Sequence, residues 1–64
     1  MSLHRTWTEN LAMTLLRREG VAVIWELHLA AAKADRQGNE PAAAAIIAIA
    51  DAVEQEWLRR KDRA

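Results

Sequence analysis

Few residues in this sequence could carry out chemistry, and His28 and Asp35 are the first candidates. On a helix the two side chains lie near one another in projection and could serve as a metal site or an acid–base pair. Two turns separate them, about 10 Å along the helix axis, so they cannot touch on one straight helix. The other histidine, His4, lies in the N-terminal lead, and the chain has no cysteine. We therefore interpret His28 as a buried or half-buried structural residue and expect no metal-binding or cofactor-binding residues.

The remaining polar residues do not form a catalytic set either. Asp51, Glu54 and Glu56 diverge around one helix and indicate a solvated face. Gly20 and Gly38 are isolated, so the chain has no glycine-rich loop that could cradle a phosphate. The single serine also lies in the N-terminal lead and is not a plausible nucleophile. We expect no catalytic residues and no enzymatic activity.

Composition excludes further classes of protein. Nine basic and nine acidic residues among 64 give a net charge of zero, whereas proteins that bind nucleic acid are usually basic. The longest apolar run is too short and too interrupted by charge to span a bilayer, and the N-terminus lacks a secretory signal pattern. Frequent alanine, and seven arginines against two lysines, suggest a GC-rich bacterial source. We expect a cytoplasmic bacterial protein, do not favour nucleic acid as a partner and expect no membrane association.

Hydrophobic periodicity, together with residues that begin and end helices, predicts an all-α fold of three helices in a single small domain, residues 1–64. Thr6 and Glu9 match a capping box that starts a first helix over about 7–19, and Gly20 is its natural end, although a continuous helix remains the alternative. A second helix covers about 21–37. It is apolar on most of its circumference, so we expect it to be central and wrapped by its neighbours.

The clearest helix-terminating signal in the sequence lies between the second and the third predicted helix. Gly38 ends one helix, Asn39 can cap the next, and Pro41 suits its first turn. The third helix covers about 40–60, and we expect the charged residues 59–64 to fray. Such a short link predicts an antiparallel hairpin of the second and third helices.

The three tryptophans, Trp7, Trp25 and Trp57, fall one on each predicted helix. In a chain without Phe or Tyr, we interpret them as core and interface anchors. The alternative is a platform on which nucleic-acid bases stack, which requires basic residues beside the rings. Only Trp57 has such neighbours, in Arg59, Arg60 and Lys61. Because the net charge of the chain is zero, we favour the interpretation as anchors.

More apolar residues are available than three helices can bury. A three-helix monomer buries about one stripe per helix and leaves patches larger than soluble monomers usually expose. We therefore predict a homodimer, with a docking face for a different protein as the alternative. The predicted interface residues are the apolar side chains outside the main stripes: Val23, Trp25, Leu29, Ile47 and Leu58.

Residues 30–57, AAAKADRQGNEPAAAAIIAIADAVEQEW, resemble a small uncharacterised all-helical domain family of sphingomonads and related alphaproteobacteria. The shared pattern is an alanine-rich helix, a Gly-Asn/Asp-Glu turn and a helix with I-A-x-A-V. This chain has Ala45 or Ile46 where that group is expected to have a tryptophan. The resemblance implies a helical domain and carries no activity to transfer.

The sequence thus predicts a small non-catalytic helical protein that acts through self-association and protein–protein interaction. One alternative is a nucleic-acid-associated regulator that uses the basic C-terminal tail. Another alternative is a phage or mobile-element inhibitor protein, by analogy with the small size and the lack of motifs of such proteins.

Overall fold

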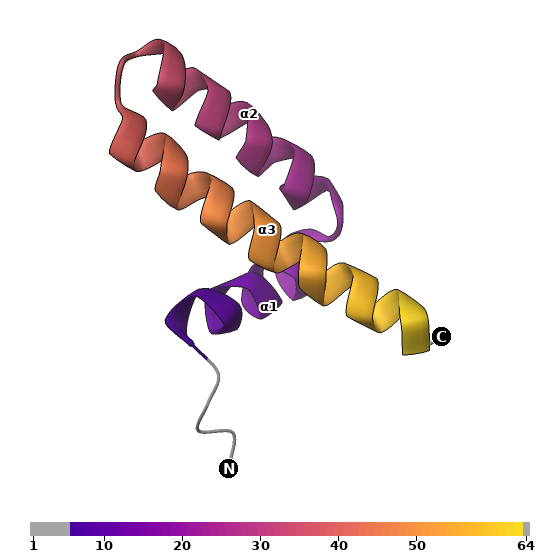
Figure 1. The fold of residues 1–64 in the computed structure, drawn as a ribbon. Helices are drawn as coiled ribbons and strands as arrows, with labels where there is room; N and C mark the ends of the chain where they lie inside the picture. Colours follow the sequence, from indigo (N-terminus) through magenta and orange to yellow (C-terminus); the bar gives the residue numbers. More distant parts are fainter. Residues whose placement is uncertain (1–5, 64) are drawn as a thin grey trace.

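The computed structural model describes residues 6–63 as three helices, with no strand in that part of the chain (Figure 1). They are α1 (Trp7–Glu19), α2 (Ala22–Arg36) and α3 (Glu40–Arg63). The prediction of an all-α fold with three helices is therefore confirmed. The other histidine, His4, and the single serine lie outside the described residues.

Local hydrogen bonds fix both ends of α1. The Glu9 backbone N–H donates to Thr6 Oγ1 at 3.1 Å, and the Thr6 backbone N–H donates to Glu9 Oε1 at 2.9 Å, which completes the predicted capping box. At the other end, Gly20 has φ +80° and its N–H donates to the Leu16 carbonyl at 3.0 Å. Only glycine adopts this backbone conformation readily, so α1 ends at Gly20 as predicted and does not continue into α2.

The turn between α2 and α3 is a Schellman motif around Gly38, which has φ +79°. The Gly38 N–H donates to the Asp35 carbonyl, and the Asn39 N–H donates to the Ala34 carbonyl, each at 2.9 Å. Asn39 Oδ1 then accepts from the Ala42 N–H at 3.3 Å and caps α3. These bonds reverse the chain within three residues, and α2 and α3 run antiparallel as predicted (Figure 1).

The central element is α3, and the prediction that the second helix is central is wrong. Figure 1 shows α1 and α2 placed on different parts of α3, and the two helices hardly contact each other. The reason is length: α3 has 24 residues, about 36 Å, so α1 and α2 can each pack on a different part of it and meet only around Val53. As a result, α2 is covered on one face only.

The C-terminal turns of α3 remain helical as far as Arg63, which corrects the expectation of fraying for residues 59–63; residue 64 lies outside the described residues. Glu56 Oε1 accepts from Arg59 Nη1 at 2.9 Å, and Glu56 Oε2 lies 3.5 Å from Arg60 Nε. Lys61 Nζ lies 5.0 Å from the centroid of the Trp57 ring, a cation–π distance. Pairs at these helical spacings favour the helical state of the last turns.

Small residues dominate the contact of α2 with α3 near the turn, where Ala31, Ala34 and Ala43 are buried. Further along α3, Ala12 and Leu16 of α1 and Val23 of α2 meet the fully buried Val53. Alanine side chains let two helix backbones approach closely, and the larger residues fill the space where the helices diverge. Val23 therefore belongs to the core, and the expectation that it stays in water is wrong.

We expect Gly38→Val to lower the thermal midpoint of unfolding by about 10 °C. A Cβ at Gly38 would meet no atom within 4 Å, so the penalty comes from the left-handed backbone and not from a clash. That penalty is about 1–2 kcal/mol for a residue with a Cβ, and each kcal/mol shifts Tm by several degrees in a domain of this size. Gly38→Asn is the control, since asparagine tolerates this conformation and should cost less. Equal midpoints for wild type and Gly38→Val would contradict the assigned end of α2.

Candidate functional site

Three apolar side chains lie exposed at successive turns on the outer face of α2. Trp25 is 68% exposed, Leu29 is 53% exposed, and Val21, which caps the start of the helix, is 50% exposed. We call these three residues the α2 outer stripe. By helical periodicity they lie on the opposite side of the helix from the buried residues that pack on α3. No element within residues 6–63 covers them.

The structure places the five predicted interface residues in three different settings. Trp25 and Leu29 lie together on the outer stripe, and Val23 is in the core at 5% exposure. Ile47 and Leu58 are exposed as expected, but both belong to α3 and are three turns apart, about 16 Å along the helix. The exposed residues Asp51 and Glu54 occupy that face of α3 between them. The predicted set is therefore not one continuous surface, and only α2 presents a stripe.

The exposed apolar residues that the prediction missed are Val21 and Trp7. Val21 lies four residues before Trp25, a spacing that places it on the same stripe. Trp7 is 73% exposed, so it is not an anchor of the core, and its interpretation as an interface anchor stays a prediction. The helix instead turns Ala12 and Leu16 toward α3, which leaves Trp7 at the start of α1 beyond the core.

His28 is exposed, which corrects its interpretation as a buried or half-buried residue. It lies outside the face of α2 that packs on α3. Across the part of the chain that the structure describes, no three His, Asp or Glu side chains gather where they could hold a metal ion. Within the same residues, no helix is long and apolar enough to cross a membrane.

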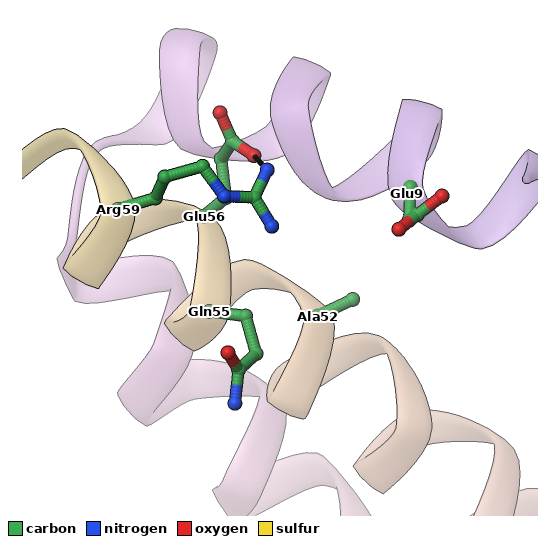
Figure 2. Close-up of a pocket in the computed structure, with 5 residues that line it drawn as sticks. All are labelled: Glu9, Ala52, Gln55, Glu56 and Arg59. Atoms are coloured by element: carbon green, nitrogen blue, oxygen red, sulfur yellow. Dashed lines mark hydrogen bonds and ion pairs between the residues drawn. The ribbon is translucent and has the colours of Figure 1, made fainter. Parts of the chain in front are cut away.

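A small polar pocket of about 240 Å³ lies where α1 meets α3 (Figure 2). Glu9 contributes from α1, and Ala52, Gln55, Glu56 and Arg59 contribute from α3. Its two carboxylates already have structural partners: Glu9 closes the capping box, and Glu56 holds two arginines. No serine, threonine, cysteine or histidine lines it that could act as a nucleophile beside them. The carboxylates of this pocket thus serve the capping of α1 and the ion pairs of α3.

Comparisons with protein families, with curated proteins and with solved structures found no match. The resemblance of residues 30–57 to a helical family of alphaproteobacteria stays a prediction. The outer stripe of α2 is thus the candidate site, and its support comes from this chain's own geometry.

Glu56 is the buried charged residue among those described, and we expect its loss to destabilise the helix bundle. Glu56→Gln should lower the free energy of unfolding by about 0.5–1 kcal/mol, a small amount because both arginines are half exposed and screened. Urea unfolding followed by circular dichroism at low salt measures the difference. Glu54→Gln, at an exposed position on the same helix, is the matched control and should change stability less. Equal effects of the two substitutions would show that the pairing of Glu56 with the arginines contributes nothing.

Proposed function

We propose that this chain is a non-catalytic helical protein that acts by self-association and protein–protein contact through the α2 outer stripe. The observation that carries the proposal is the exposure of Val21, Trp25 and Leu29 at successive turns of a helix whose opposite face is packed. Single exposed apolar residues are ordinary on protein surfaces. A row of them that includes a tryptophan is typical of contact surfaces, because aromatic anchors contribute much of the binding energy there.

A second copy of the chain is the partner that this surface favours. Transfer of a leucine or valine side chain out of water contributes about 1.5–3 kcal/mol. A twofold pairing buries the stripe of both copies at once, and twofold dimers are the commonest closed assemblies. Such a dimer also leaves α1 and the α2–α3 turn unaltered, since neither lies on the outer face of α2.

The alternative of a nucleic-acid regulator has less support, because the basic residues near the C-terminus already have partners. Arg59 and Arg60 both contact Glu56, and Lys61 lies over the Trp57 ring. A ring covered by its own lysine presents that face to the lysine and not to a base. The net charge of zero also provides no general attraction to phosphates.

We expect light scattering after gel filtration at micromolar concentration to give a mass near twice the 7.2 kDa of one chain. Leu29→Glu should shift the protein to the monomer, because a dimer would then bury a carboxylate in an apolar contact. Ala48→Glu, at an exposed position of α3, is the matched control and should leave the dimer intact.

A wild-type mass near 7 kDa at all concentrations would overturn the homodimer. The outer stripe would then remain a surface for a different protein. Circular dichroism on each variant tests whether the three helices persist. This control distinguishes dissociation of a folded dimer from unfolding of the variant.

A further inference from the structure

The outer face of α2 carries a heptad-like row of exposed residues that extends the outer stripe toward the C-terminal end of the helix. The row is spaced alternately three and four residues apart, the spacing of the contact positions in helix pairs that wind around each other. Every member is exposed. We call it the α2 seam; it consists of Ala22, Trp25, Leu29, Ala32 and Arg36.

Charged residues line both edges of the seam in pairs of mixed type. Glu26 and Lys33 lie on one edge, two helical turns apart, and both are exposed. His28 and Asp35 lie on the other edge with the same separation and are also exposed. Each edge therefore carries one acidic residue and one lysine or histidine. The acidic residue comes first along the helix on the edge of Glu26 and last on the edge of His28.

We propose that two copies of this chain associate through α2 in antiparallel orientation, with a twofold axis that passes beside Leu29 and Ala30. This rests on the proposed self-association and specifies its geometry. In an antiparallel helix pair, each edge faces the same edge of the other copy, with its residue order reversed. The axis at this level places Glu26 against Lys33 of the second copy, and Lys33 against Glu26. The charge pattern is thus complementary to itself.

The seam fits the same axis in its side-chain sizes. Leu29 lies near the axis and meets its own equivalent, while the short side chains of Ala22 and Ala32 allow the helices to approach closely. Trp25 then enters the space between Ala32 and Arg36 of the second copy. The methylene stem and the guanidinium of an arginine both pack favourably on an indole ring. At this axis His28 and Asp35 of the second copy lie along the same edge but are offset by four residues, about 6 Å along the helix, so the direct charge pairing lies on the edge of Glu26 and Lys33.

A parallel pair does not satisfy these groups. It places every seam residue level with its own copy, so that Arg36 meets Arg36 and two like charges are brought together. On the edges, a parallel pair places Glu26 and Lys33 of one copy against the edge of His28 and Asp35 of the other, so that Glu26 no longer meets Lys33 and Lys33 lies near His28. The antiparallel arrangement is the one that pairs the opposite charges of Glu26 and Lys33.

Reversal of single charges and then of both tests the pairing. Glu26→Lys brings two lysines together at two places in the dimer and should raise the dissociation constant about tenfold at low salt. Lys33→Glu should weaken the dimer similarly. The double variant Glu26→Lys with Lys33→Glu restores opposite charges and should return the constant to within about twofold of wild type. Sedimentation equilibrium gives the constants, and in about 1 M salt the differences should collapse.

Glu54→Lys makes the same charge change on α3 and is the matched control, with an expected constant close to that of wild type. A double variant as weak as either single one overturns the antiparallel pairing. A wild-type dimer that Glu26→Lys leaves unchanged also overturns it, while the proposed self-association stands. A wild-type chain that is monomeric throughout overturns both.

Cysteine cross-linking provides a second measurement that does not depend on charge. The chain has no cysteine, so a single introduced thiol forms a disulfide only with its equivalent in the second copy. Disulfide formation thus reports the distance between the two equivalent sites. Leu29→Cys should form a disulfide dimer under mild oxidation, because its equivalent lies beside the axis. Ala22→Cys should not, since the two sites would be about 22 Å apart along the helices, too far for a disulfide. Cross-linking at both positions would indicate a parallel pair and overturn the proposal.

Discussion

The structure depends on the contact that α3 makes with both other helices through a face of small residues. Ala50 and Val53 are completely buried on it, and Ala43 is buried nearer the α2–α3 turn. Because these side chains are short, α2 can lie close to α3, and α1 can reach Val53 from another side. α1 and α2 hardly contact each other, so each depends on α3 for its place in the fold.

This dependence determines which face of α2 is left outside. The helix has two apolar faces: one that carries Val23, Leu27, Ala31 and Ala34, and one that carries Trp25 and Leu29. With α3 as its main contact among the described residues, α2 buries one of them. The face with Ala31 and Ala34 packs on the small residues of α3 near the turn, and this leaves Trp25 and Leu29 in water. The exposed stripe is therefore a consequence of how closely the two helices pack.

The features that the sequence predicts correctly are those that depend on neighbouring residues alone. The capping box of Thr6 and Glu9, the break at Gly20 and the end of α2 at Gly38 are all closed by hydrogen bonds within a few residues. Sequence spacing determines such bonds directly. The antiparallel hairpin follows from the shortness of the link. By contrast, Glu56 is expected on a solvated face with Asp51 and Glu54 but is buried at 9% exposure, where it pairs with Arg59 and Arg60.

The features that the sequence misses depend on a choice between faces. Periodicity alone cannot tell which side of α2 packs on α3, because apolar residues occur nearly all round it. The sequence therefore places Val23 outside the main stripes although it lies in the core, and it predicts a buried or half-buried His28 although this residue is exposed. The size of Trp7 suggests a core or interface anchor, but the core positions on α1 are filled by Ala12 and Leu16. Alanine is a weak hydrophobic signal in sequence, yet here it decides the packing.

The identity of the residues on the outer face of α2 is not required by the fold of residues 6–63. Alanine or lysine at the positions of Trp25 and Leu29 would keep the helix and leave every core contact in place, because neither side chain belongs to the core. A tryptophan in water costs free energy without stabilising the bundle, and it becomes favourable once another surface covers it. The edges of that face carry Glu26 and Lys33 at the separation that a reversed copy of the same helix complements. In the dimer that we propose, the apolar seam provides the attraction between two copies, and the charges of Glu26 and Lys33 determine their direction.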